Sequence, residues 1–174
     1  MINFIDTGIY NLIFKMQNVP VTIGMKFFSF MGSATVLITL TFMILLLAKN
    51  KMIATRIAIN LTAVFLINRI MKYIFRRPRP QVLRLAEETG FSFPSAHAMV
   101  SMGYYGFFIY LSYKYIKNKK LKIASISILA LLIFLIGISR IYLGVHYATD
   151  VLCGFIFGII YLYIFTQKIR WKKV

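Results

Sequence analysis

The sequence predicts an all-α integral membrane protein, a helical bundle of about five transmembrane helices preceded by an interfacial amphipathic helix. Of the 174 residues, 60% are hydrophobic and 14% are charged, and the mean hydropathy is +0.77, which is unlike an ordinary soluble domain. Crossing a hydrocarbon core takes about 20 helical residues. Five apolar runs without charges, or with charges only near their ends, are therefore expected to span the membrane. They are Phe27–Ala48, Met52–Phe75, Ala98–Tyr113, Ile123–Ser139 and Val151–Gln167.

The first 20 residues are expected to form a helix that lies in the membrane interface. Residues 1–16 include Asp6 and Lys15 and are too short to span comfortably. Apolar side chains recur at helical spacing in this segment, which places them on one face. They are Ile2, Ile5, Ile9, Leu12, Ile13 and Met16. A signal peptide is disfavoured, because the segment has neither a basic n-region nor a small-residue cleavage site.

Basic residues gather in short clusters between the apolar runs. With five spans, three of these clusters fall on one side, which the positive-inside rule assigns to the cytoplasm. The clusters are Lys49, Lys51 and Arg56; Lys114, Lys117, Lys119, Lys120 and Lys122; and Lys168, Arg170, Lys172 and Lys173. The acidic residues Asp6, Glu87, Glu88 and Asp150 then face the outside of a bacterial cell membrane. The net charge of +17 is not gathered on one polar face, so we expect the bilayer, and no nucleic acid, as a partner.

No linker, repeat or low-complexity segment divides the chain, so residues 1–174 are expected to form one membrane-embedded domain. Cys153 lies inside an apolar run and is interpreted as a packed thiol. Gly154 and Gly158 form a small-xxx-small pair, which indicates close helix packing. We assign this packing to the inside of the bundle rather than to a dimer, and expect a monomer.

One histidine is followed four residues later by an aspartate, in the segment Ser139-Arg140, five residues, His146, three residues, Asp150. On a helix this spacing stacks the two side chains on one face, where the carboxylate can bond one ring nitrogen. The other nitrogen is then free to act as a nucleophile or a base. Gly144 suits a tight turn into such a helix. A purely structural His-Asp pair is the alternative.

The second histidine belongs to Pro94-Ser95-Ala96-His97, directly before a charge-free run. Ser95 is a natural N-cap, and Pro94 prevents the helix from extending backward. The free N–H groups and the helix dipole would make an anion site here, with His97 able to donate a proton to a leaving oxygen. The alternative is an interfacial histidine bonded to headgroups or loop carbonyls.

Positive charge on the same side is predicted to hold a phosphate. Arginine's planar fork matches phosphate oxygens, and lysine acts as a point charge. The candidates are Lys72, Arg76, Arg77, Arg79 and Arg140. We interpret Arg76, Arg77 and Arg84 as flanking charges that attract anionic headgroups. Glu87 and Glu88 are interpreted as solvated loop residues that could pair with those arginines.

The sequence contains no evident metal motif. Two histidines and four carboxylates are too few and too dispersed for a two-metal phosphatase, and neither HExxH nor a Walker-type glycine loop is present. Protein cations and N–H donors must then balance the charge of a bound phosphate. This favours phosphoryl transfer through a covalent phosphohistidine, with no metal and no other cofactor.

Together the three motifs resemble those of the phosphatidic acid phosphatase type 2 superfamily of membrane lipid phosphatases. Its signature is Lys-x6-Arg-Pro, Pro-Ser-Gly-His and Ser-Arg-x5-His-x3-Asp. The corresponding segments here are KYIFRRPRP at 72–80, PSAH at 94–97 and SRIYLGVHYATD at 139–150. Three separated motifs with fixed internal spacing are a specific signal, and the resemblance extends from about the second span to the last.

This resemblance implies a role for each matching residue. His146 is similar to the family's nucleophile, oriented by Asp150, and His97 to the general acid that protonates the leaving group and then activates water. The implied phosphate-binding residues are Lys72, Arg79, Ser95 and Arg140, together with N–H groups near Ala96 and His97. Again no metal is implied.

Two features depart from the family pattern. Ala96 stands where the family usually has glycine; in the first turn of a helix this replacement costs little, so activity is expected to survive. Bacterial members commonly have six spans, and this chain is expected to lack the first, so its N-terminal segment is expected to start outside.

The predicted function is therefore that of a multi-pass membrane lipid phosphatase with an active site open to the extracytoplasmic side. Undecaprenyl diphosphate is the favoured substrate, with phosphatidylglycerophosphate and phosphatidate as further candidates. Two alternatives are a lipid phosphotransferase that uses the same site and a non-catalytic lipid-phosphate binding or transport protein. The second is disfavoured because His97, His146 and Asp150 are all present.

Overall fold

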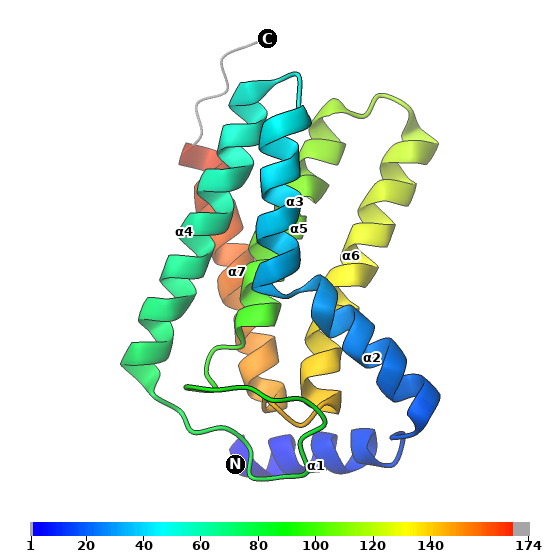
Figure 1. The fold of residues 1–174 in the computed structure, drawn as a ribbon, viewed down its shortest axis with the longest axis vertical. Helices are drawn as coiled ribbons and strands as arrows, with labels where there is room; N and C mark the ends of the chain where they lie inside the picture. Colours follow the sequence, from blue (N-terminus) through cyan, green and yellow to red (C-terminus); the bar gives the residue numbers. More distant parts are fainter. Residues whose placement is uncertain (1, 169–174) are drawn as a thin grey trace.

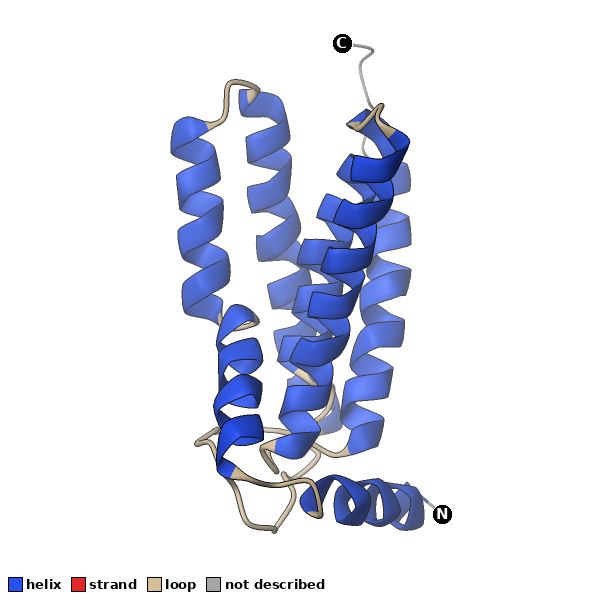
Figure 2. Cartoon of the chain, turned by 90° about the vertical axis from the view of Figure 1, so that its right-hand side faces the viewer, coloured by secondary structure: helices blue, strands red, loops and turns tan. Residues whose placement is uncertain are grey.

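The computed structural model describes residues 2–168, and within this range every regular secondary-structure element is a helix; the helices form an elongated bundle (Figures 1 and 2). This confirms the predicted all-α class. The helices are α1 (Ile2–Phe14), α2 (Val19–Met31), α3 (Ala34–Leu47), α4 (Lys51–Phe75), α5 (Ala96–Tyr115), α6 (Lys119–Tyr142) and α7 (Ala148–Lys168). A long loop, residues 76–95, connects α4 to α5 and crosses one end of the bundle.

Helix α5 occupies the centre of the bundle and packs against α4, α6 and α7. Its side chains Met99, Tyr104 and Phe107 are almost fully buried, and they form one core with Val64 of α4 and Ile136 of α6. Burying this apolar surface against neighbouring helices fixes the position of the N-terminal end of α5. That end carries the PSAH motif.

Three described helices, α4, α6 and α7, are long and apolar enough to cross a membrane, and α2 with α3 adds a fourth if this bent pair is one span. The remaining predicted span, Ala98–Tyr113, lies within α5. Helix α5 is not among these candidates. Because other helices pack around α5, its polar side chains Ser101, Tyr104 and Tyr105 are buried in protein rather than exposed to lipid. A central helix can therefore be less apolar than the helices around it.

The predicted span from Phe27 to Ala48 is not a single straight helix. It includes the end of α2 and all of α3, which meet at an angle of 48°. Ser33 caps α3 by accepting a hydrogen bond from the N–H of Val36 at 3.3 Å. A Cβ at Gly32 would lie 2.5 Å from Ile136 and 3.1 Å from the ring of His97. Because Gly32 has no Cβ, the break between α2 and α3 can lie close to α6 and to His97.

Helix α1 lies across the end of the bundle rather than along it, as predicted for the N-terminal segment (Figures 1 and 2). Ile9 and Ile13 pack on the bundle, whereas Leu12 and Met16 are exposed. The predicted interfacial segment, residues 1–20, ends earlier than expected, because Asn18 caps α2 from Val19 onward. Residue 1 and the side chains of residues 2–5, including Ile2 and Ile5, lie outside the described part.

The two ends of the bundle differ in charge as the sequence predicts. The α3–α4 turn and the α5–α6 turn, with their lysines, lie at one end, together with the end of α7 (Figure 1). The last basic cluster is described only at Lys168, since residues 169–174 lie outside the described residues. The long loop, α1 and the start of α7 lie at the opposite end. All four acidic residues belong to these elements.

Candidate active site

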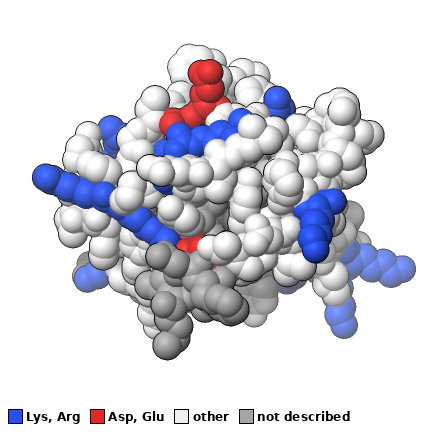
Figure 3. Space-filling view, turned by 90° about the horizontal axis from the view of Figure 1, so that it is seen from below, with Lys and Arg blue, Asp and Glu red and all other residues white. Residues whose placement is uncertain are grey.

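The three motifs converge around one cavity at the end of the bundle that α1 crosses. This cavity has a volume of about 330 Å³. Five of the predicted site residues line it: Lys72, Arg79, Ala96, His97 and His146. They come from α4, the long loop, the start of α5 and the α6–α7 connection. Viewed from this end, the acidic side chains that can be seen lie beside basic ones, and uncharged surface surrounds them (Figure 3).

The connection between α6 and α7 places His146 at the cavity. Gly144 adopts a φ of +70°, and a Cβ there would lie 2.5 Å from the carbonyl oxygen of Leu83, so the turn requires glycine. This confirms the predicted tight turn. His146 precedes α7, however, and does not share a helix with Asp150. The predicted stacking on one helical face is therefore wrong, and the two residues approach by another route.

Ser92 of the long loop links His146 to Asp150. Its Oγ donates to Asp150 Oδ2 at 2.5 Å and lies 3.2 Å from His146 Nδ1. The direct distance from His146 Nδ1 to Asp150 Oδ2 is longer, 3.5 Å. The carboxylate thus reaches the imidazole both directly, as predicted for this pair, and through the serine hydroxyl.

The contacts of His146 define its tautomer. Arg79 Nη1 lies 3.2 Å from Nε2 of the ring. A guanidinium can only donate hydrogen bonds, so Nε2 must carry the lone pair and Nδ1 the proton. The Nδ1–H then donates to the Ser92 oxygen, whose own proton goes to Asp150. The unprotonated Nε2 is the nitrogen available for nucleophilic attack.

His146 lies in a loop outside the membrane-spanning segments, and its side chain is 2% exposed. Burial lowers the pKa of His146 to about 3, because protein surroundings solvate an imidazolium poorly. The carboxylate of Asp150 acts to raise this pKa, whereas the cations Arg79, Arg140 and Lys72 lower it further. The ring is consequently neutral at pH 7, which a nitrogen nucleophile requires.

Asp150 lies behind His146 and is fully buried in the first turn of α7. Its Oδ1 accepts a hydrogen bond from Arg77 Nη1 at 2.7 Å, and its Oδ2 accepts one from the N–H of Tyr147 at 3.0 Å. The interpretation of Arg77 as a flanking charge for lipid headgroups is therefore wrong. Its guanidinium also reaches the buried Asp6 of α1, so it is fully engaged inside the protein.

Arg79 and Lys72 both hold the loop as well as lining the cavity. Arg79 donates to the carbonyl oxygens of Thr89, Gly90 and Val145, at 2.9–3.1 Å. Lys72 Nζ donates to the carbonyl oxygens of Phe91 and Ser92, at 2.5 and 3.3 Å. Their charges are thereby fixed in place at the wall of the cavity.

Arg140 lies next to the cavity that contains His146 rather than on its wall. It is buried near the end of α6 and lines a neighbouring cavity with Lys26 and His97, rather than the one that contains His146. It donates to Ser29 Oγ and to Glu88 Oε1. Glu88 Oε2 also lies 3.6 Å from Arg79 Nη2. Glu88 is thus not a freely solvated loop residue; its carboxylate lies between two predicted phosphate-binding arginines.

Helix α5 begins at Ala96, as the PSAH motif predicts, with Ser95 at the N-cap position. The Ser95 side chain makes no capping hydrogen bond, and its buried Oγ has no partner among the described residues. Ala96 has no positive φ, which supports the expectation that alanine is tolerated there. The first N–H groups of a helix have no intrahelical acceptor, so those of Ala96 and His97 face the cavity end of α5.

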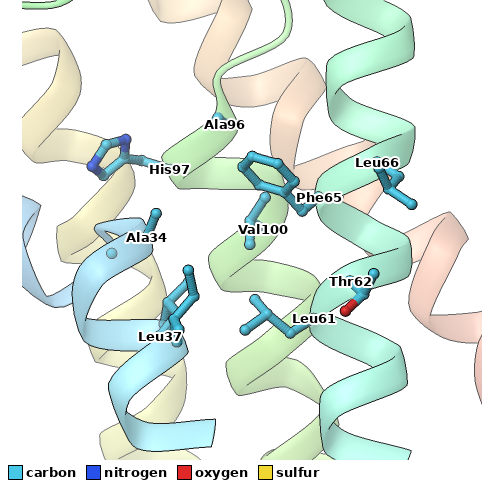
Figure 4. A pocket seen from close by; sticks show the side chains of 11 residues that line it. Ala34, Leu37, Leu61, Thr62, Phe65, Leu66, Ala96, His97 and Val100 are labelled. Atoms are coloured by element: carbon cyan, nitrogen blue, oxygen red, sulfur yellow. The ribbon is translucent and has the colours of Figure 1, made fainter. Parts of the chain in front are cut away.

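His97 and Ala96 also border a second, apolar cavity of about 280 Å³ between α3 and α4. Leu37 from α3 and Leu61 and Phe65 from α4 line it, with α5 behind (Figure 4). His97 and Ala96 lie at one end of this cavity in the same view. The polar and apolar cavities thus meet at the start of α5.

Comparison with known proteins places this arrangement in a family. The family model described as PAP2 superfamily matches residues 53–173, well over half of the chain. The chain belongs to the PAP2 superfamily. Phosphatidylglycerophosphatase B of Bacillus subtilis (strain 168) is 38% identical over 112 residues. That match covers 60% of this chain and only 54% of the relative, so the chain spans about half the relative's length.

Solved PAP2-type structures have the same fold. A transmembrane PAP2-type phosphatidylglycerolphosphate phosphatase from Bacillus subtilis aligns with a TM-score of 0.85 at 28% identity, covering 93% of this chain and 83% of that one. LpxE of Aquifex aeolicus aligns with a TM-score of 0.72 at 25% identity, covering 92% and 94% of the two chains. An all-helical, multi-pass membrane architecture follows from these relationships and from the candidate spans.

Two residues near this site, Ser92 and Asp6, were not predicted from the sequence, and a third, Arg77, was interpreted as a flanking charge. Ser92 lies three residues before Ser95, so its nearness to the PSAH motif was the available signal. Arg77 lies within the first motif but not at a signature position. For Asp6, on α1, the available signal was a carboxylate within an otherwise apolar segment.

Among residues 2–168, no three His, Cys, Asp or Glu side chains are grouped so as to hold a metal ion. The cationic side chains that line the polar cavity are Arg69, Lys72 and Arg79, and those of Lys26 and Arg140 line the neighbouring cavity. Metal independence remains a prediction, to be tested with chelators.

Proposed function

We propose that this PAP2-superfamily protein is a lipid phosphatase that cleaves the phosphate monoester or diphosphate of a membrane lipid through His146. One observation carries the proposal: the unprotonated Nε2 of His146 borders a polar cavity that shares Phe65, Ala96 and His97 with an apolar cavity between α3 and α4. A phosphate attached to a hydrophobic tail fits this pair of cavities.

The proposed reaction has two steps. In the first, Nε2 of His146 attacks phosphorus, and the bond from phosphorus to the leaving oxygen breaks as His97 donates a proton to that oxygen. In the second, His97 accepts a proton from water, which attacks the phosphohistidine and releases phosphate. Asp150, acting through Ser92, keeps His146 in the Nδ1–H tautomer throughout.

The phosphate oxygens are proposed to bind Lys72, Arg79 and Arg140, the Ser95 hydroxyl, and the N–H groups of Ala96 and His97. Cations and N–H donors held in place before the reaction stabilise the charge of the transferring phosphoryl group. The side chains of Ser95 and Arg140 each contain a buried polar atom without a partner among the described residues, Oγ and Nε respectively, which supports this assignment.

For the substrate, the names of the relatives make phosphatidylglycerophosphate the first compound to test. Undecaprenyl diphosphate and phosphatidate complete the panel. We place the site on the extracytoplasmic face of a bacterial cell membrane, because the basic clusters lie at the opposite end of the bundle. A lipid in the outer leaflet could then present its phosphate to the cavity directly.

The test is phosphate release by the purified protein in detergent micelles, measured for each of the three lipids. Replacing His146 with Asn should lower kcat by at least about a thousandfold, as expected for loss of a covalent nucleophile. Lys117→Ala, at the opposite end of the bundle, is the control and should have no effect. Full activity of the His146→Asn variant would exclude the phosphohistidine mechanism.

Two further measurements separate the alternatives. Hydrolysis in ¹⁸O-labelled water should place the label in the released phosphate; phosphate found only on an added lipid or sugar acceptor would indicate a phosphotransferase. Activity should persist in excess EDTA, and its loss would contradict the metal-free mechanism.

A further inference from the structure

Arg77 joins two buried carboxylates that lie 144 residues apart in the sequence. Its Nη1 donates to Asp150 Oδ1 at 2.7 Å, and its Nη2 donates to Asp6 Oδ2 at 2.8 Å. The side chains of Asp150 and Asp6 are only 0% and 2% exposed. Buried carboxylates are stable only when they are paired, and this guanidinium serves both.

The same contacts attach α1 to the start of α7. Asp6 Oδ1 accepts a hydrogen bond from the N–H of Thr149, and Asp6 Oδ2 accepts one from its hydroxyl, both at 2.9 Å. Arg77 Nη1 also donates to that hydroxyl at 2.7 Å, and its guanidinium carbon lies 4.0 Å from the centre of the Tyr147 ring. Arg77 is thus held from α1, from α7 and from the loop that carries His146.

We propose that Arg77, held by Asp6 of α1, is a positioning residue that orients the Asp150 carboxylate toward Ser92 and His146. The amphipathic helix α1 would then be part of the catalytic apparatus and not only a membrane contact. This proposal rests on the proposed function of His146, because positioning matters only if the imidazole reacts.

The division of contacts between the two oxygens of Asp150 supports this role. Oδ1 is bound by Arg77, whereas Oδ2 accepts from Ser92 and from the N–H of Tyr147 and faces His146. Without Arg77, the carboxylate would lose the only charged donor to its Oδ1 among residues 2–168. It could then rotate away from Ser92, and its negative charge would act on the imidazole without compensation.

Charged or titratable side chains surround His146 from α4, α5, α6, α7 and the long loop. Asp150 is on α7, Arg79 is on the long loop, and His97, Lys72 and Arg140 are on α5, α4 and α6. Arg77 and Asp6 form a second layer behind Asp150. Removing the Arg77 charge should therefore favour protonation of His146, whereas removing the Asp6 charge should not.

The test compares Arg77→Gln, Asp6→Asn and the double variant D6N/R77Q in the full-length protein in detergent. The double variant matters because Arg77→Gln alone leaves two unpaired buried carboxylates and could fail to fold. Ile9→Ala is the matched control, since Ile9 packs α1 on the bundle but makes no contact in this charged group. Readouts are kcat and KM for phosphatidylglycerophosphate, and ¹⁵N NMR of the chain's two histidines, assigned with His97→Gln.

We expect Arg77→Gln, or the double variant, to lower kcat by about tenfold or more while KM changes by less than about threefold, as for other groups that orient a reactive residue. The protonation midpoint of His146 should move to higher pH in both. Asp6→Asn alone should lower kcat by less, without raising the midpoint. Ile9→Ala should leave kcat and the midpoint unchanged.

Three results would overturn the proposal: wild-type kcat in the double variant, an unchanged His146 midpoint in it, or an equal loss of kcat in Ile9→Ala. Failure of the proposed function would look different. The wild-type protein would then release no phosphate from any lipid, while the NMR midpoint would still report whether Arg77 acts on His146.

Discussion

Two features determine the state of the His146 imidazole. One is its burial, and the other is a pair of hydrogen bonds, from Nδ1 to Ser92 and from Ser92 to Asp150. Burial keeps the ring neutral, and the Ser92–Asp150 path keeps the proton on Nδ1. Arg79 approaches the other nitrogen without protonating it, because an arginine does not release its proton in a protein. The result is a neutral, oriented imidazole beside fixed positive charges, as the proposed attack on a phosphate dianion or monoanion requires.

The low pKa of His146 predicts a specific loss of stability in acid. In the unfolded chain this histidine takes up a proton near its ordinary pKa of about 6.5, whereas the folded protein resists protonation down to pH 3. The unfolded state therefore binds more protons in this window, and the free energy of unfolding falls as the pH decreases from about 6.5 toward 3. One such group changes the free energy of unfolding by at most about 1.4 kcal/mol per pH unit.

Melting temperatures in detergent at pH 7 and pH 5 test this prediction. The variant His146→Gln cannot take up the proton and should lose less stability between these pH values than the wild type. An equal loss in both proteins would show that His146 does not titrate as its burial implies.

Ser92 should be necessary for full activity although it contacts no predicted phosphate position. In Ser92→Ala, His146 Nδ1 loses its partner at 3.2 Å, and Asp150 loses one donor. We expect kcat to fall about 10- to 100-fold, equivalent to about 1.4–2.8 kcal/mol of transition-state stabilisation. Ser101→Ala is the control, because Ser101 is equally buried and its Oγ has no partner among the described residues. Equal kcat in both variants would contradict the serine link.

At the scale of the helices, the contact between α5 and α7 holds two of the three motifs together. Gly154 and Gly158 face α5, so the predicted small-xxx-small packing lies within the bundle. A Cβ at Gly154 would lie 3.0 Å from the carbonyl oxygen of Ser95, which is the N-cap residue of α5. The N–H of Ser95 in turn donates to the carbonyl oxygen of Asp150 at 3.0 Å. Close helix packing thus sets the distance between His97 and Asp150.

Gly158→Ala should destabilise the protein. The added Cβ would lie 2.6 Å from the Cβ of Met102 and 2.9 Å from the carbonyl oxygen of Met99, so α5 and α7 would have to move apart. The expected cost is about 1–3 kcal/mol, as for other overpacked sites. Gly24→Ala in α2 is the control: nothing lies within 4 Å of its added Cβ, and alanine favours the helix by about 0.5–1 kcal/mol. Unfolding in SDS titrations measures both, and a Gly158→Ala protein as stable as the control would contradict this account.

Across the whole molecule, the polar cavity, the apolar cavity and the basic turns occupy distinct positions. The polar cavity lies near one end, the apolar cavity extends from it between α3 and α4 toward the middle of the bundle, and the lysine-rich turns lie at the far end. A lipid entering from the membrane could therefore place its tail between helices while its phosphate reaches His146. The charge difference between the two ends favours one orientation in the bilayer.

Cysteine labelling in intact cells tests that orientation. In a Cys153→Ala background, we expect Gln81→Cys in the loop at the site to react with an impermeant maleimide added outside. Lys120→Cys, at the opposite end, should react only after the membrane is opened; both residues are exposed. The reverse pattern would place the site in the cytoplasm and exclude an outer-leaflet substrate.

Much of this protein is predictable from residues that are near one another in the chain. Apolar runs predict the helices, the turn at Gly144 follows from its glycine, and the three motifs identify the residues around the polar cavity. These features depend on local backbone preferences and on the spacing of side chains along one segment. The family resemblance, carried by those same motifs, was confirmed.

Contacts between side chains that are far apart in the chain could not be predicted in this way. The path from His146 through Ser92 to Asp150, the pairing of Arg77 with Asp6, and the placement of Glu88 between Arg79 and Arg140 all join separate elements. A loop and a crossing helix bring these side chains within hydrogen-bond distance only after the bundle has packed. A buried charge must find a partner, but which partner it finds depends on how helices far apart in the sequence meet in space.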